Sequence, residues 1–183
     1  MTKYYFSKCK NEHLHQNIIV SNKPLFPIQL YYICAHKKIM SKLVVKKSTI
    51  PGSGKGLFTK RDIKKGERII EYLGEIITEA ECNRRAENNF SGYVFYISKR
   101  KCIDAYSDHK ALARYANDAR GLIRIKGIKN NCCYEIWKNR GWINAEKNIK
   151  AGDEIFVSYG AEYWRDIRHN IKLEKETQKA KTQ

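Results

Sequence analysis

The chain has 183 residues, enough for one domain or two small ones, and its 36 Lys and Arg against 19 Asp and Glu give a net charge of +17. Hydrophobic residues make up 42% and aromatic residues 11%, which excludes a disordered basic tail, while 11 Gly and 3 Pro exclude collagen-like and low-complexity sequence. The excess of positive charge indicates a polyanionic partner such as nucleic acid, chromatin or a membrane surface.

The N-terminal residues differ from the rest of the chain because their apolar side chains follow no sustained period. We expect an extension over 1–40, a domain over 41–164 and a charged tail over 165–183. The extension contains cysteine and histidine side chains, but their spacing fits no common zinc finger, so we expect no metal site. These side chains are Cys9, His13, His15, Cys34 and His36.

Targeting signals are not evident in the sequence. No apolar run reaches the roughly 18 residues that span a bilayer, and the first residues lack the uncharged stretch of a signal peptide. Six cysteines without a tight framework indicate reduced thiols. We therefore expect an intracellular protein that is neither secreted nor inserted in a membrane.

Short strand-like segments separated by turns begin at Leu43, and few helices interrupt them. Thr78 is a good helix N-cap and Glu81 stands at the capping-box position, which predicts a helix over 78–88. Because strands and helices do not alternate regularly, the pattern predicts an α+β fold that is mostly β. The expected segments are strands at 43–48, 57–63, 64–69, 69–77 and 152–160, two strands within 91–105, a short helix or turn at 109–118, a hairpin over 132–149 turning at 139–141, and a helical or frayed tail.

A glycine loop occupies residues 51–56, with the sequence PGSGKG. It is not a P-loop, because Thr49 stands where that motif requires its first glycine and Gly56 where it requires Ser or Thr. Dinucleotide binding is also excluded, since no parallel-sheet unit surrounds the loop. Two interpretations stay open: an ordinary hairpin turn, or a ligand site lined by backbone, which glycine allows to approach closely.

Further motifs follow the glycine loop in a characteristic order. They are Tyr72-Leu73-Gly74-Glu75, Arg114-Tyr115-Ala116-Asn117, Asn131-Cys132-Cys133-Tyr134 and the segment 152–160, GDEIFVSYG. Together with the glycine loop, this set resembles the SET-domain protein lysine methyltransferases over about residues 42–164, most closely the compact SET domains of viruses and microbes. The resemblance implies the SET-domain (β-clip) fold, with several small sheets and a C-terminal pseudoknot that threads the segments of Asn117 and Tyr159 past each other.

The resemblance also implies the site residues. The cofactor would be S-adenosylmethionine, and the residues expected to bind it are Ser53, Gly54, Lys55, Gly56, Tyr93 and Asn117. Of Tyr163 and Trp164, we expect Trp164 to cover the adenine; the alternative is that both aromatic residues only cap the core. Tyr159 would stand beside the methyl-transfer axis, Tyr72 would line the lysine channel, and Tyr134 would limit the number of methyl groups to one or two. Asp118 departs from the family pattern, which usually has His there, and no zinc-binding segment follows Tyr159.

The expected activity is methyl transfer to a deprotonated lysine in a tyrosine-lined channel, with a histone tail as substrate. Aromatic walls exclude water, and a channel of this kind disfavours the charged ammonium form of lysine. The alternative, for which Asp118 is the best argument, is a weakly active or inactive SET-fold module that binds chromatin or nucleic acid. Expected partners are a lysine-bearing protein, nucleosomal DNA and a second copy of the chain. We expect the protein to be located in the nucleus, or in the nucleus or cytoplasm of a host cell.

Overall fold

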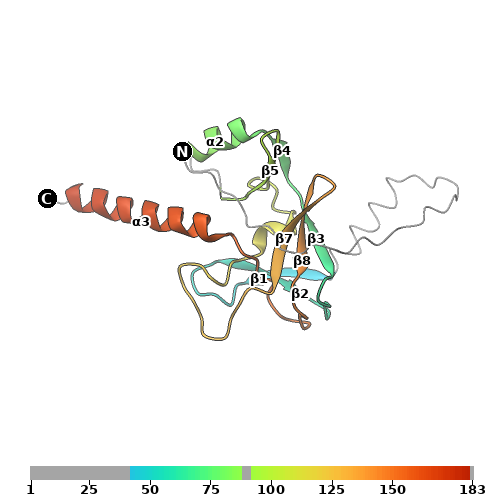
Figure 1. Ribbon diagram of the computed structural model, residues 1–183. Helices are drawn as coiled ribbons and strands as arrows, with labels where there is room; N and C mark the ends of the chain where they lie inside the picture. Colours follow the sequence, from blue (N-terminus) through green and yellow to red (C-terminus); the bar gives the residue numbers. More distant parts are fainter. Residues whose placement is uncertain (1–41, 88–91, 182–183) are drawn as a thin grey trace.

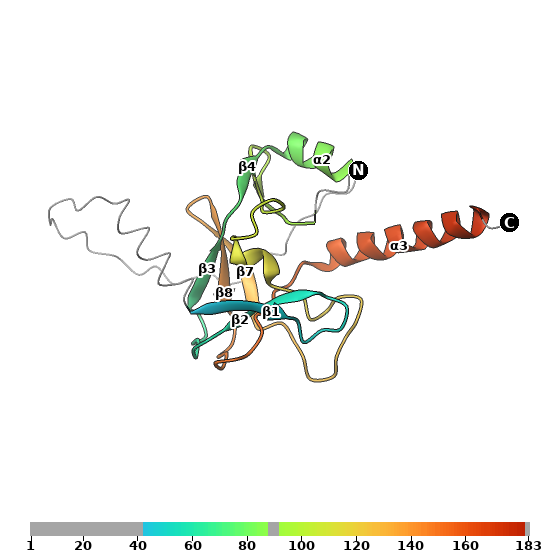
Figure 2. The same cartoon turned by 180° about the vertical axis from the view of Figure 1, so that it is seen from behind.

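The computed structural model describes residues 42–87 and 92–181, so the expected extension over 1–40 and its cysteine and histidine side chains lie outside the described residues. Figures 1 and 2 show a body of small sheets from which one long helix projects. The elements are β1 (Leu43–Lys47), β2 (Lys55–Thr59), β3 (Arg68–Tyr72), β4 (Glu75–Ile77), α2 (Glu79–Glu87), β5 (Val94–Ser98), β6 (Lys101–Asp104), the 3-10 helix η1 (Leu112–Tyr115), β7 (Cys132–Trp137), β8 (Arg140–Ala145) and α3 (Ala161–Lys181).

The strands form three small antiparallel sheets. Their strand orders are β1-β2, β3-β8-β7 and β4-β6-β5. All three sheets pack on a common core of aliphatic and aromatic side chains, in which Leu57, Ile143 and Ile155 are fully buried. The sheet β4-β6-β5 also buries a second, small cluster of Ile77, Val94 and Cys102. An α+β fold made mostly of strands is therefore confirmed.

The hairpin of β7 and β8 turns one residue earlier than expected. Lys138 and Asn139 occupy its tip with φ of 48° and 58°, the left-handed backbone that a two-residue hairpin turn requires. Arg140 already pairs with Trp137 across the two strands. Along β8 the buried residues alternate with partly exposed ones, as expected for a strand with one face in the core.

The helices follow their local signals. The Thr78 hydroxyl oxygen accepts a hydrogen bond from the Glu81 backbone N–H at 3.2 Å, which confirms the predicted N-cap of α2. The Glu81 carboxylate does not complete a capping box, because it pairs with Arg84 and Arg85. Helix α3 begins at Ala161, before the expected tail, and extends away from the sheets (Figure 1).

The segment 152–160 is not the strand that its sequence predicts. It makes only isolated bridges, antiparallel between Glu154 and Phe58 and parallel between Phe156 and Asn117. The Val157 N–H donates to the Asn117 carbonyl at 2.9 Å, and the Ile155 N–H donates to Leu57 at 2.7 Å. The segment therefore runs between parts of the chain that lie far apart in sequence and holds them together.

The cysteines are not all reduced. Cys82, Cys102 and Cys132 are free thiols, whereas Cys133 is disulfide-bonded, so the expectation of reduced thiols is wrong at that residue. No helix in residues 42–87 and 92–181 has both the length and the apolar character that a membrane span needs.

Candidate active site

Three tyrosines, from β3, β7 and the segment 152–160, are gathered inside the core. The rings of Tyr72 and Tyr134 lie edge to face at 6.0 Å, and Phe95 packs on both, at 5.3 Å from Tyr72 and 5.1 Å from Tyr134. Tyr159 packs against the same core. Tyr72 and Tyr134 thus form an aromatic cluster with Phe95, while Tyr159 adjoins the same core and makes its own ring contacts with Tyr163 and Trp164.

The tyrosine hydroxyls are oriented by backbone carbonyls. Tyr72 donates its hydroxyl hydrogen to the Tyr93 carbonyl at 2.9 Å, and Tyr159 donates to the Ala116 carbonyl at 2.8 Å. Burial raises the pKa of Tyr72, Tyr134 and Tyr159 far above the ordinary value of a phenol, and neighbouring tyrosines add to the shift at Tyr134 and Tyr159. The hydroxyls are therefore neutral at physiological pH, and each oriented oxygen keeps lone pairs that can accept a further hydrogen bond.

The glycine loop joins β1 to β2 and turns at two glycines with positive φ. Gly52 has φ of 78° and Gly54 of 67°, conformations that L side chains rarely adopt. The Ser48 N–H donates to the Gly54 carbonyl at 2.9 Å and closes the loop. The loop is thus a hairpin turn, and its residues Ile50, Pro51, Gly52 and Ser53 also line a cavity.

Glu154 fastens the glycine loop to the pseudoknot. Its buried carboxylate accepts four hydrogen bonds: from the Ser48 hydroxyl at 2.7 Å, from the N–H and hydroxyl of Thr49 at 2.7 and 2.6 Å, and from the Asn117 amide at 3.1 Å. A side chain at Gly56 would collide with this carboxylate. Sequence reasoning missed Glu154 as a site residue, since an acidic residue in a predicted strand gives no sign of four donors from distant segments.

Asn117 and Asp118 order the opposite wall. The Asn117 amide also donates to the Lys55 carbonyl at 3.0 Å, so this amide bridges β2 and the segment 152–160. The Asp118 carboxylate is buried and accepts from the Tyr159 N–H and the Trp164 ring N–H, both at 2.8 Å. The residue that departs from the family pattern therefore fixes Tyr159 and the start of α3.

A cavity of about 160 Å³ opens between these parts. The glycine loop lines one side, and the Trp164 ring, stacked on Tyr159 at 5.8 Å, lines another. Leu122 and Ile123, each about half exposed, form an apolar rim. Aromatic and aliphatic walls beside backbone and amide groups suit a flat heteroaromatic ring that carries polar substituents.

The expected cofactor residues divide into two groups. Ser53, Asn117 and Trp164 line this cavity, whereas Gly54, Lys55, Gly56 and Tyr93 are not among its lining residues. Tyr93 instead lies under the Arg114 guanidinium, 3.9 Å from its ring centre, next to the Tyr72 hydroxyl. Leu122 and Ile123 were missed, because two apolar residues within a basic loop show no periodicity.

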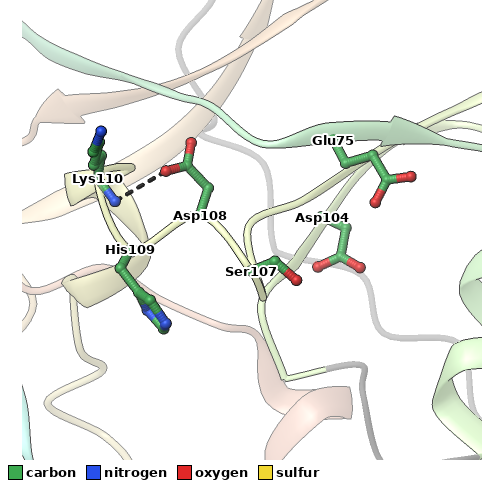
Figure 3. A pocket seen from close by; sticks show the side chains of 6 residues that line it. All are labelled: Glu75, Asp104, Ser107, Asp108, His109 and Lys110. Atoms are coloured by element: carbon green, nitrogen blue, oxygen red, sulfur yellow. Dashed lines mark hydrogen bonds between the residues drawn. The ribbon is translucent and has the colours of Figure 1, made fainter.

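A second and wider cavity, about 440 Å³, lies beside β4 and β6 (Figure 3). Figure 3 shows the carboxylates of Glu75 and Asp104 side by side, with Ser107 between Asp104 and Asp108. Arg85 binds Glu75 at 2.8 Å and Asp104 at 2.6 Å, and this pairing holds the pKa of the Glu75 carboxyl below its usual range. His109 and Lys110 complete the lining.

Comparisons with known proteins agree with the motifs. The SET domain model matches residues 54–160. The chain is 32% identical over 130 residues to the histone-lysine N-methyltransferase EZH2 of Chaetomium thermophilum, covering 64% of this chain and 8% of that protein. It is 29% identical to the N-lysine methyltransferase KMT5A of Xenopus tropicalis, covering 63% of this chain and 36% of that protein.

A solved structure is similar to this chain in fold and in sequence. An active polycomb repressive complex 2 in the basal state matches with a TM-score of 0.53 and 34% identity, covering 64% of this chain and 15% of that one. The chain thus spans only a small part of the relatives that it matches. Because the SET domain model covers more than half of the chain, the protein belongs to the SET-domain family.

Proposed function

We propose that the protein is an S-adenosylmethionine-dependent protein lysine N-methyltransferase that acts on a histone tail. The observation that carries the proposal is the pseudoknot contact between Asn117 and Phe156, because it sets Tyr159 beside both the glycine-loop cavity and the tyrosine cluster. A methyl donor and a lysine would thus meet at one residue. The names of the relatives, which are lysine methyltransferases, support the same reaction class.

The residues around the smaller cavity fit the cofactor. Trp164, Leu122 and Ile123 offer apolar surface to an adenine ring, and their partial exposure in the protein alone is what an aromatic ligand would cover. Ser53 offers polar groups, and the Asn117 amide is held toward the cavity by its bonds to Lys55 and Glu154. When bound, S-adenosylmethionine supplies an activated methyl group on a sulfonium.

The chain's own residues would keep the lysine amine uncharged and aligned. Tyr72, Tyr134 and Tyr159 stay neutral, so none of them provides the anion that would stabilise an ammonium. The positive charge of the Arg114 guanidinium also reaches the Tyr72 hydroxyl. There it lowers the pKa of Tyr72 against the larger, raising effect of burial, and the same charge would disfavour a nearby ammonium. The tyrosine oxygens would accept hydrogen bonds from the amine, and the rings would exclude water.

The wider cavity is the proposed site for the basic peptide. Its carboxylates come from Glu75, Asp104 and Asp108, and it lies beside Tyr93, whose carbonyl accepts from both Tyr72 and the Ala105 N–H. Glu71 does not contribute to this site, because it is paired with Arg140 on the neighbouring strand. We also propose that the protein is located in the nucleus, or in the nucleus or cytoplasm of a host cell. We further propose that it forms a homodimer, which a molar mass from light scattering would test.

The experiment is methyl transfer from labelled S-adenosylmethionine to histones and nucleosomes. Wild-type protein should label a histone lysine. Tyr159→Phe should abolish transfer while the protein stays folded, with the free energy of unfolding lowered by only about 1 kcal/mol for the lost hydrogen bond to the Ala116 carbonyl. Tyr96→Phe, at a partly buried tyrosine on β5 outside the cluster, is the matched control. Cofactor binding without transfer to any histone would favour the binding-module alternative, and full activity in Tyr159→Phe would refute the assigned role.

A further inference from the structure

The charged residues of the loop 119–131 are all positive. It contains four basic residues, Arg120, Arg124, Lys126 and Lys129, and no Asp or Glu. All four are exposed. The nearest carboxylate in the sequence, Asp118, is buried and occupied by hydrogen bonds to Tyr159, Trp164 and Asn130, so it does not neutralise the loop.

The end of the β1–β2 hairpin adds three more cations. Lys46, Lys47 and Lys55 are exposed, and Lys47 stands directly opposite Lys55 in the strand register. Like charges in such a pair destabilise a sheet, so the arrangement costs stability in the protein alone. A polyanion bound there would remove that cost.

The two segments form one surface, which we call the cationic end. Ile50 of the glycine loop packs with Ala119 and Phe156, and Ile128 covers them, so the two loops share a small apolar cluster. Figures 1 and 2 show both loops side by side at the end of the molecule away from α2 and β4. Within the described part of the chain, no ion pair involves any of its seven basic side chains, whereas Arg61 and Lys150 elsewhere are paired with Glu67 and Asp62.

We propose that the cationic end binds the phosphate backbone of duplex DNA. The proposal rests on the proposed function, because the tail of a histone is presented beside DNA. A basic histone peptide would be repelled by this surface and attracted instead to the acidic cavity of Glu75 and Asp108 beside β4 and β6, at the other end of the molecule (Figure 1). The charge would thus dock the enzyme on the nucleosome while the peptide enters elsewhere.

The test measures binding of a fluorescent DNA duplex by anisotropy over a salt series. The loop variant Arg124→Gln, Lys126→Gln, Lys129→Gln is compared with Arg168→Gln, Lys175→Gln, Lys179→Gln, which removes the same three charges from exposed positions on α3. The slope of log K against log salt should become shallower by about 3 for the loop variant, about 1 for each phosphate that the variant no longer neutralises. The α3 variant should keep the wild-type slope.

The outcomes separate this proposal from the proposed function. Transfer to a free histone peptide should be unchanged in the loop variant, while transfer to nucleosomes should fall, and thermal unfolding checks that the loop variant folds. Equal losses of DNA affinity in both triple variants, or tighter binding to single-stranded RNA or anionic vesicles than to duplex DNA, would overturn the DNA assignment. DNA binding that depends on the loop, without methyl transfer to any histone, would support the DNA-binding role of the cationic end and refute the proposed methyltransferase activity.

Discussion

Replacing Glu154 by Gln is expected to loosen the glycine loop from Asn117. The carboxylate accepts four hydrogen bonds, two at Oε1 from Ser48 and Asn117 and two at Oε2 from Thr49. An amide has only one acceptor atom, so its NH₂ group must face donors at one end. The Thr49 backbone N–H has no freedom to turn, which favours the amide oxygen at that end and leaves NH₂ toward Ser48 and Asn117.

The magnitude follows from this count. The Ser48 hydroxyl can rotate to accept, but the Asn117 amide nitrogen cannot, so one hydrogen bond to a charged group is lost outright. Such a bond contributes about 1.5–3 kcal/mol, and we expect the free energy of unfolding to fall by about 2 kcal/mol. The Asn117 amide keeps its bond to the Lys55 carbonyl but is no longer held from two sides. Affinity for S-adenosylmethionine should then fall about tenfold, which corresponds to about 1.4 kcal/mol.

Two measurements check this prediction. Urea unfolding gives the change in stability, and calorimetric titration with S-adenosylhomocysteine gives the change in affinity. Glu162→Gln on α3 is the control, since that exposed carboxylate makes only a 4.0 Å ion pair with Arg165 and should change stability by less than about 0.5 kcal/mol. An unfolding free energy and affinity within error of the wild type would show that Glu154 does not connect the loop to Asn117.

Three further predictions follow from the same site. Tyr134→Phe should raise the methylation state of the product by mass spectrometry, because the lost hydroxyl leaves room for another methyl group; an unchanged product spectrum would contradict this. Gly121→Ala should displace the Trp164 ring, which lies 2.9 Å from the new Cβ, costing about 1–3 kcal/mol and shifting tryptophan fluorescence, whereas Gly92→Ala, with nothing within 4 Å, should do neither. Because burial raises the pKa of Tyr72, Tyr134 and Tyr159, the folded state keeps protons that the unfolded state loses above pH about 10, so urea midpoints should fall as pH rises beyond that value; a constant midpoint would place these phenols in water.

Local patterns predicted the elements whose signals are local. The N-cap at Thr78, the two strands on either side of 99–100 and the hairpin of β7 and β8 each depend on a few neighbouring residues, and the structure contains all of them. The segment 152–160 failed as a strand because its alternating apolar residues meet several partners rather than one. Ile155 bonds to Leu57 and Phe156 bridges Asn117, which no local pattern specifies.

The site was predictable only in part, for a related reason. Motif order indicated the tyrosines that the fold gathers, but side chains that act through distant partners gave no signal. Arg85 lies 19 residues from Asp104, and its binding to both Asp104 and Glu75 offsets part of the negative charge of the wider cavity. Glu71 is likewise neutralised by Arg140, a partner 69 residues away.

Asp118 orders the cavity wall that Asn117, Tyr159 and Trp164 form. A buried carboxylate without partners would be costly and would disturb Asn117 next to it. Instead Asp118 accepts from backbone and side-chain donors on three segments, including Asn130 at 2.8 Å and the Trp164 ring N–H at 2.8 Å. The same carboxylate therefore orders the cationic loop, the aromatic wall and Tyr159 together. The residue that departs from the family pattern therefore leaves this wall ordered, and its presence is no argument against a working site.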